Sequence, residues 1–234
     1  MKNEVIETFL DLVKISSPSR KERVLADYIK DNSSTRDELL GELERKTNIL
    51  TVQPRMMSGH IQGAILKMIT HMTAPRRVVE IGTFTGYSAL CMASAMEEGS
   101  ELHTIDINDE IAYIAEEYFE RSGLGAIIRQ HIGSALDVIP QLGGVFDLVF
   151  MDGDKREYVA YYDLLMDGGY LRSGSFILAD NVLWDGKVVD RSPKNLKDKY
   201  TATILEFNRR VSEDSRVEVI IMPFRDGMSI IRVK

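Results

Sequence analysis

The sequence has one cysteine, Cys91, among its 234 residues. A single cysteine excludes an internal disulfide and any metal site built from several cysteines, and it suits a reducing compartment. Because Cys91 lies in the apolar helical run SALCMASAM, we interpret it as a packing residue and not as a nucleophile. The four histidines lack the spacing of metal ligands, so we interpret them as structural or surface residues: His60, His71, His103 and His131.

Long apolar runs are absent as well. No run approaches the roughly 18 residues needed to cross a bilayer. The N-terminus MKNEVIETFL lacks the basic-then-apolar pattern of a signal peptide. We therefore expect a cytoplasmic protein without membrane association. The formal net charge of −7 argues against a broad nucleic-acid footprint, although it is compatible with a local basic patch.

The composition is that of an ordinary globular protein, with 44% hydrophobic and 28% charged residues. A chain of this length fits one large domain or one domain with an appendage. Residues 1–73 carry apolar residues at three- and four-residue spacing, which predicts helices. We expect residues 1–73 to be a helical appendage to a core of residues 74–234, and the two parts to form one compact domain.

From Arg77 onward, short apolar runs alternate with helical patterns. Five such repeats predict a parallel sheet with helices on both faces, because right-handed crossovers place them there. The last two β-rich runs, RVEVIIMPF and GMSIIRVK, are separated only by RDG, which is too short for a crossover helix and predicts an antiparallel hairpin. The predicted fold class is α/β, with a doubly wound, mostly parallel seven-stranded sheet, a C-terminal antiparallel hairpin and N-terminal helices.

A glycine turn follows the first apolar run. In VVEIGTFTGYSAL, Glu80, Gly82 and Gly86 lie at a strand-to-helix turn, where the backbone can approach a ligand. Phe84 stands where a dinucleotide fingerprint would have its second glycine, which disfavours pyrophosphate binding. Asp106, twenty residues after Gly86, can accept hydrogen bonds from both ribose hydroxyls. Together these residues predict a nucleoside site without a pyrophosphate, although Glu80 alone would suit a strand-end acid and Asp106 a helix cap.

Oxygen ligands follow two neighbouring strands of the predicted sheet. Asp152 ends the apolar run of FDLVFMDGDK, and Asp180 and Asn181 end the run of ILADN. The carboxyl ends of adjacent parallel strands lie side by side, so these three side chains can converge. Two carboxylates and one amide suit a hard octahedral cation, most simply Mg²⁺, with Ca²⁺ or Mn²⁺ as alternatives.

Four segments, VVEIGTFTGYSALCMA, FDLVFMDGDKREYVAYYDLL, ILADNVLWDGKVVD and MPFRDGMSIIRVK, occur in the order of the motifs of the cation-dependent O-methyltransferases. The chain resembles this family, which contains catechol and caffeoyl-CoA O-methyltransferases, over roughly residues 24 to 234. The resemblance implies a Rossmann-like class I methyltransferase fold, S-adenosylmethionine as methyl donor, and a homodimer. It also implies that the N-terminal part acts as a lid, as a dimer contact or in substrate selection.

The resemblance assigns roles to individual residues. It implies that the metal ligands are Asp152, Asp180 and Asn181, and that Lys155 takes the phenolic proton. It implies that the donor is bound by Met57, Ser58, Glu80, Gly82, Thr83, Ser88, Asp106, Ala135 and Asp152, with Asp106 on the ribose and Ala135 beside the adenine. The chain departs from the family's SPEQG-like stretch, where SGHIQG keeps only Ser58, Gln62 and Gly63 at matching places.

The predicted chemistry is methyl transfer to a hydroxyl of a small catechol-like or hydroxycinnamoyl compound. A phenol is mostly protonated at neutral pH, and a bound cation both acidifies it and orients two adjacent oxygens. A nearby dication and partial burial would favour a neutral Lys155 as base. Trp184 suits either a wall of the acceptor pocket or core packing, and Asp154 suits a solvated acid or a neighbour of the metal ligands.

Two rival functions follow from the same residues. One is methylation of a hydroxylated uridine in tRNA, for which the acidic balance is unfavourable although local basic patches exist: Arg20, Lys21 and Arg23, or Lys194, Lys197 and Lys199. The other is a donor-binding protein without catalysis, which the full set of metal ligands and Lys155 disfavours. The sequence leaves the acceptor open.

Overall fold

The computed structural model describes residues 28–29, 31–34, 37–190, 192 and 197–234. The chain divides into two compact units, Met1–Asp37 and Glu38–Lys234. Residues 1–27 of the predicted helical part and the basic residues Arg20, Lys21, Arg23 and Lys194 lie outside the described residues.

The boundary between the two units lies between Asp37 and Glu38. Helices α3 (Glu38–Leu50) and α4 (Gly59–Thr73) belong to the second unit because their apolar faces are buried in its core. Leu43 of α3 and Leu66 of α4 are both 0% exposed and lie in one hydrophobic cluster with the sheet.

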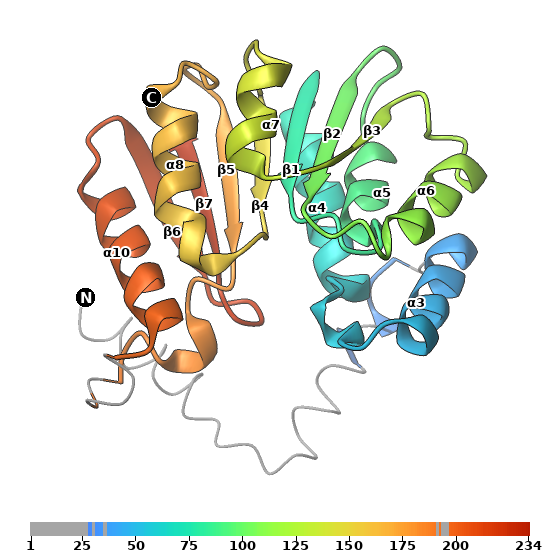
Figure 1. The fold of residues 1–234 in the computed structure, drawn as a ribbon, viewed down its shortest axis with the longest axis horizontal. Coiled ribbons are helices and arrows are strands. Elements are labelled where there is room, and N and C mark those ends of the chain that lie inside the picture. The colour runs from blue at the N-terminus through green and yellow to red at the C-terminus, as the bar shows by residue number, and fades with distance from the viewer. Residues whose placement is uncertain (1–27, 30, 35–36, 191, 193–196) are drawn as a thin grey trace. The chain divides into compact units, whose positions relative to one another are not determined.

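One seven-stranded sheet forms the centre of the second unit, in the order β3-β2-β1-β4-β5-β7-β6 (Figure 1). Strands β1 to β5 are parallel, and β7 is antiparallel to both β5 and β6. The predicted parallel sheet with a C-terminal antiparallel hairpin is therefore confirmed. The strands are β1 (Arg77–Ile81), β2 (Glu101–Asp106), β3 (Ile128–Ile132), β4 (Leu148–Met151), β5 (Phe176–Asp180), β6 (Val217–Met222) and β7 (Met228–Val233).

Helices cover both faces of the sheet. One face carries α3, α4, α5 (Tyr87–Ala93) and α6 (Ala112–Arg121), and the other carries α7 (Ala135–Leu142), α8 (Tyr158–Asp167) and α10 (Lys199–Glu213). Three short 3₁₀ helices are η1 (Pro54–Met56), η2 (Lys155–Glu157) and η3 (Trp184–Gly186). Among the described residues, no helix is both long and apolar enough to cross a membrane.

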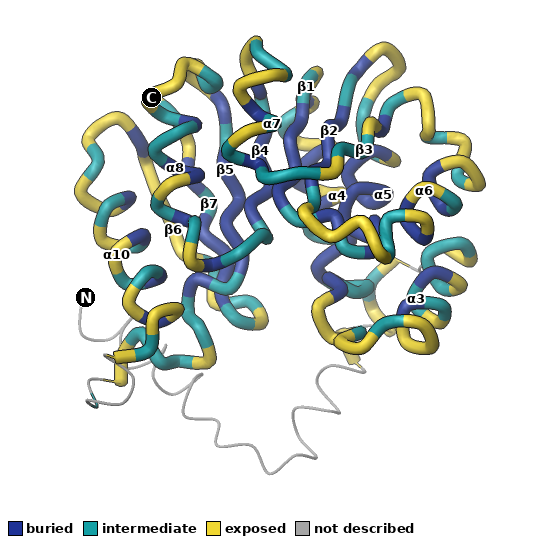
Figure 2. Tube along the Cα trace, viewed as in Figure 1, coloured by how far each residue is buried: buried dark blue, intermediate teal, exposed yellow. Residues whose placement is uncertain are grey.

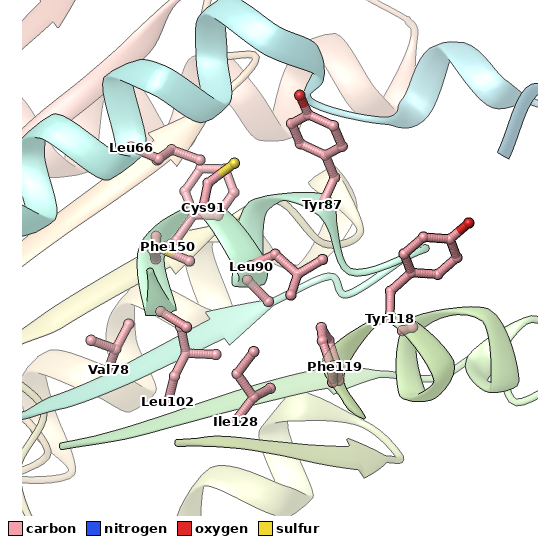
Figure 3. Close-up of a cluster of buried hydrophobic side chains, with 14 of the residues drawn as sticks. Leu66, Val78, Tyr87, Leu90, Cys91, Leu102, Tyr118, Phe119, Ile128 and Phe150 are labelled. Atoms are coloured by element: carbon pink, nitrogen blue, oxygen red, sulfur yellow. The ribbon is translucent and has the colours of Figure 1, made fainter. Parts of the chain in front are cut away.

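Two hydrophobic clusters lie on opposite faces of the sheet, because successive side chains of a strand point to opposite sides. Val78 and Phe150 belong to the cluster under α4 and α5, whereas Val79 and Val149 belong to the cluster under α7, α8 and α10. Figure 2 shows that the central strands are buried. Figure 3 shows the first cluster, to which Cys91 and Leu66 both belong, and Cys91 is buried as expected of a packing residue.

The strand order places a topological switch between β1 and β4. The chain runs from β1 outward through β2 to β3, and then returns to β4 on the other side of β1. In such sheets, ligands bind outside the carboxyl ends of the strands at the switch. The site is therefore expected where β1, β2, β4 and β5 end.

Candidate active site

Backbone hydrogen bonds hold the carboxyl ends of the strands together. The Gly82 amide donates to the Ile105 carbonyl (2.8 Å), and the Asp152 amide donates to the Ile81 carbonyl (2.8 Å). Asp180 ends β5, the neighbour of β4. The structure thus brings the predicted donor residues and the predicted metal ligands to one edge of the sheet.

The glycine turn packs against the end of β4. Gly82 has φ of 104°, and a Cβ at this position would lie 2.6 Å from the Asp152 carbonyl oxygen. Any side chain would therefore separate the turn from β4. Gly82 has a packing role that the sequence did not indicate, in addition to its predicted role at the ligand.

Glu80, near the end of β1, has a strongly raised pKa. It is 0% exposed, and Thr104 donates a hydrogen bond of 2.5 Å to its Oε2. Burial raises the pKa of Glu80 to about 8, while the Ser88 and Thr104 hydroxyls act in the opposite direction. Its Oε1 is buried, and no described residue meets it with hydrogen-bond geometry. The carboxylate can accept a hydrogen bond from a ligand at this oxygen.

The hydroxyl groups around Glu80 form a short chain, because Thr83 and Thr104 lie 2.6 Å apart through their Oγ1 atoms. Thr83 and Ser88, both predicted donor contacts, are 2% and 5% exposed. Thr104 is a neighbour that the sequence analysis missed, since a threonine inside a strand carries no signal of its own.

Asp106 is held at the end of β2 by two backbone amides. Phe84 donates to its Oδ2 (2.8 Å) and Asn108 to its Oδ1 (2.9 Å). Each oxygen has further lone-pair capacity, so capping the turn and accepting ribose hydroxyls are compatible roles. Ala135, the predicted adenine neighbour, begins α7, and the Gly133 amide donates to the Asp106 carbonyl (2.9 Å). Asp106 and the start of α7 are therefore close.

Asp152, Asp180 and Asn181 lie together at the ends of β4 and β5. Burial raises the pKa of Asp152 to about 6, Lys155 opposes this shift, and the negative charge of Asp180 adds to it. Asn181 has φ of 58°, a left-handed conformation that asparagine tolerates better than most residues. Among the described residues, no three His, Cys, Asp or Glu side chains form a metal-binding group. A cation here would thus need the Asn181 amide besides the two carboxylates.

Lys155 is held within the site. It is 8% exposed, and its Nζ donates to Asp152 Oδ1 (2.7 Å) and to the Tyr158 hydroxyl (2.8 Å). Tyr158 Oη also lies 2.9 Å from both the Met151 and the Asp180 carbonyl oxygens. With its single proton, the hydroxyl donates to one of these carbonyls at a time. Tyr158 was missed by the sequence analysis, where it was one of several tyrosines in a helical run.

Asp154 and Trp184 have contacts at the rim. Asp154 accepts a hydrogen bond from the Arg156 amide (2.9 Å), pairs with the Arg156 guanidinium, and so caps η2. These contacts with Arg156 lower the pKa of Asp154. The Trp184 ring stacks on Tyr200 at 5.6 Å and packs against the second hydrophobic cluster. Asp154 is thus a turn-capping residue, and Trp184 packs against the core.

The segment before α4 reaches the same edge of the sheet. Met57 and Ser58, predicted donor contacts, are 8% and 9% exposed. The Ser58 carbonyl accepts a hydrogen bond from Arg225, and Gln62 donates to Asp180 Oδ2 (2.7 Å). The sequence analysis assigned Gln62 no role and did not single out Arg225, because these contacts join residues 118 to 167 positions apart.

Fold and site together define a class I methyltransferase. A model of the O-methyltransferase family matches residues 30–234, so the chain belongs to this family. Caffeoyl-CoA O-methyltransferase 1 of Nicotiana tabacum is 33% identical over 180 residues, which cover 73% of this chain and 74% of the relative. The catechol O-methyltransferase of Niastella koreensis is 31% identical over 182 residues, which cover 74% of this chain and 80% of the relative.

Solved structures agree with this assignment. A methyltransferase from Podospora anserina, bound to S-adenosylhomocysteine, superposes with a TM-score of 0.83 at 27% identity, covering 93% of this chain and 97% of that one. An O-methyltransferase from Bacillus cereus, also bound to S-adenosylhomocysteine, superposes with a TM-score of 0.82 at 26% identity, covering 90% of this chain and 97% of that one. This chain is an S-adenosylmethionine-dependent O-methyltransferase.

Proposed function

We propose that this O-methyltransferase requires a divalent cation and methylates one of two adjacent hydroxyls on a small aromatic compound of catechol or hydroxycinnamoyl type. The observation that carries the proposal is that Lys155 pairs with Asp152 at the end of β4 and that the charge of Asp180, at the end of the neighbouring β5, acts on Asp152; Asn181 follows Asp180 in the chain. The named relatives act on acceptors of this kind, which supports the substrate class.

The donor set fits a hard cation. Asp152, Asp180 and Asn181 offer two negative charges and an amide oxygen, and Mg²⁺ prefers such ligands, with Mn²⁺ or Ca²⁺ as alternatives. When bound, the cation would acidify an acceptor hydroxyl and bring a second, adjacent oxygen into the site. This chemistry favours vicinal diols over isolated phenols.

The donor would lie across the ends of β1 and β2. Glu80, Gly82, Thr83 and Ser88 would hold its methionine end, where the buried Oε1 of Glu80 can accept from an ammonium group. Further contacts would come from Asp106 on the ribose, Ala135 beside the adenine, and Met57, Ser58 and Asp152. S-adenosylmethionine supplies an electrophilic methyl group on a sulfonium, so no further activation of the leaving group is required.

Lys155 is the proposed base. Its neutral amine takes the phenolic proton while the phenolate oxygen forms a bond to the methyl carbon and the carbon–sulfur bond breaks. Asp152 Oδ1 and the Tyr158 hydroxyl hold the amine in place before transfer. The resulting ammonium remains beside the Asp152 carboxylate, which stabilises its charge. Most of the acceleration would come from this fixed orientation.

A methylation assay with labelled donor tests the substrate class. Catechol and phenol form a matched pair, because they differ only in the second hydroxyl, and hydroxycinnamoyl thioesters and bulk tRNA extend the comparison. We expect transfer to catechol or a dihydroxycinnamoyl thioester in the presence of Mg²⁺, and little transfer to phenol. Equal rates on catechol and phenol, or transfer to tRNA alone, would contradict the proposal.

Two further proposals rest on the family resemblance: that the protein is a homodimer, and that its N-terminal part selects the acceptor. A third, that the protein is cytoplasmic, rests on its single cysteine and on the lack of long apolar runs. Size-exclusion chromatography with light scattering tests the first.

A further inference from the structure

The turn between β6 and β7 packs against the segment that follows Asp180. The Val182 amide donates to the Gly227 carbonyl (3.1 Å), and the Leu183 amide donates to the Asp226 carbonyl (2.8 Å). A Cβ at Gly227 would lie 2.4 Å from Leu183 Cγ, so the two segments are in close contact. The C-terminal hairpin therefore reaches the end of β5.

Arg225 in this turn has an unfavourable backbone conformation. Its φ is 50°, a left-handed conformation that glycine adopts without steric cost and arginine does not. The side chain offsets this cost through two hydrogen bonds to the start of α4. Its Nη1 donates to the Ser58 carbonyl oxygen and to Gln62 Oε1 (2.6 Å in the second case).

The contact with Arg225 determines the orientation of the Gln62 amide. A guanidinium group only donates hydrogen bonds, so the group that faces it must be the amide oxygen. The amide nitrogen of Gln62 then points the other way and donates to Asp180 Oδ2 (2.7 Å). Gln62 is 1% exposed, so water does not compete for these contacts.

Asp180 is held through both of its oxygens. Oδ2 accepts from the Gln62 side chain, and Oδ1 accepts from the backbone N–H of Asn181 (2.9 Å). Each carboxylate oxygen has a second acceptor site, which is available to a cation. The rotation of the carboxylate is thus fixed by neutral donors that leave its negative charge in place.

We propose that Arg225 and Gln62 are positioning residues, which orient Asp180 for the cation and connect this ligand to the Ser58 segment of the donor site. The inference rests on the proposed function, since it concerns how the proposed metal ligand is held. Without Gln62, the hydrogen bond from Arg225 to Ser58 can remain, whereas loss of Arg225 removes the hydrogen bonds to both Gln62 and Ser58. Loss of Gln62 should therefore weaken binding of the metal only, and loss of Arg225 should weaken binding of both the metal and the donor.

Binding of Mn²⁺ in the presence of S-adenosylhomocysteine tests this directly, with free Mn²⁺ measured by electron paramagnetic resonance. We expect Gln62→Met and Arg225→Gly to raise the Kd for Mn²⁺ about 10- to 100-fold, as is usual when a partner of a metal ligand is removed. Gln62→Met should leave the Kd for S-adenosylhomocysteine unchanged, and Arg225→Gly should raise it. Arg225→Lys should restore part of the Mn²⁺ affinity, because lysine still donates to Gln62.

Two controls separate positioning from a merely structural role. Arg225→Gly removes the unfavourable backbone conformation together with the side chain, so its melting temperature should stay within about 4 °C of the wild type. Arg232→Ala removes an arginine of the same hairpin whose ion-pair partner is Glu218, and it should bind Mn²⁺ as the wild type does. If Gln62→Met melts without a cooperative transition, the Mn²⁺ affinities of Arg225→Gly and Arg225→Lys test the positioning role instead.

Asp180→Ala distinguishes failure of the positioning role from failure of the metal site. If Asp180→Ala loses Mn²⁺ while Gln62→Met and Arg225→Gly bind it as the wild type does, the positioning role is overturned and the metal site stands. If the wild type binds no Mn²⁺, or Asp180→Ala binds it equally well, the metal site is overturned and the positioning role with it.

Discussion

The two halves of the sheet edge are built differently. Where β1 and β2 end, the contacts join neighbouring βα units: Thr104 with Glu80, and Phe84 with Asp106, at separations of 24 and 22 residues. Where β4 and β5 end, Asp180 is contacted by Gln62, 118 residues away, and Gln62 by Arg225, 163 residues away. The donor half is thus assembled locally, and the metal half depends on the complete fold.

This difference has a chemical counterpart. The donor half offers hydroxyls, amides and one buried acid, which suit a ligand bound by hydrogen bonds. In the metal half, Lys155 pairs with Asp152, and the negative charge of Asp180 acts on the same carboxylate. Changes in the metal half should therefore affect turnover, and changes in the donor half should affect binding and stability.

The largest effect is expected from Asp180→Ala. Loss of a metal ligand should lower kcat/KM about 10³-fold, because a bound cation contributes several kcal/mol to the transition state. The Kd for S-adenosylhomocysteine, measured by calorimetry, should stay close to that of the wild type. A parallel loss of donor affinity would show that the two halves are not separable.

Lys155→Ala should have the next largest effect. Removal of the base should lower kcat about 10²- to 10⁴-fold while KM for the donor stays nearly constant. Lys187→Ala is the matched control, since Lys187 lies near Trp184 at the rim and makes no contact with Asp152 in the described residues. A wild-type kcat for Lys155→Ala would remove Lys155 as the base.

Gly82→Ala probes the contact between the halves. The new Cβ would clash with the Asp152 backbone at an unfavourable φ, and the free energy of unfolding should fall by about 3 kcal/mol. Gly99→Ala is the control, because Gly99 also has a positive φ (81°) but open space around its Cβ. It should cost only about 1 kcal/mol. Equal losses in urea unfolding would show that backbone conformation alone makes Gly82 necessary.

Glu80→Gln should have the smallest effect, on the pH dependence of stability. The folded-state pKa of Glu80, about 8, lies above its ordinary value of 4.5, so the folded protein holds a proton that the unfolded chain releases. Stability is then lost as pH rises from about 4.5 to 8, by at most about 1.4 kcal/mol per pH unit. Above pH 6, where the Asp152 contribution ends, Glu80→Gln should flatten this slope in the ligand-free protein. If the pH dependence of stability is the same in Glu80→Gln and in the wild type, the raised pKa of Glu80 is contradicted.

The sequence was sufficient to predict the sheet and its C-terminal hairpin. Alternating apolar runs and helical patterns predict parallel strands, and RDG is too short to cross over. Asp152, Asp180 and Asn181 were predicted to converge because neighbouring strands end at the same edge, and β4 and β5 are indeed paired in parallel and end side by side. Motifs that lie within one βα unit are therefore accessible from the sequence.

The missed features depend on packing between distant segments. The packing of α3 and α4 on the sheet could not be read from the sequence, because amphipathic spacing shows that a helix is buried but not against which partner. Gln62 and Arg225 meet only after the hairpin folds onto α4. The feature that distinguishes Arg225 is its positive φ, which cannot be predicted from the residue pattern. Tyr158 likewise became identifiable only through its contact with Lys155.

The most direct test of the metal half is methyl transfer from labelled donor to catechol in EDTA, followed by titration with Mg²⁺. The account predicts no transfer in EDTA, full recovery with Mg²⁺ in the wild type, and no recovery in Asp180→Ala. Transfer at the same rate with and without EDTA would contradict it.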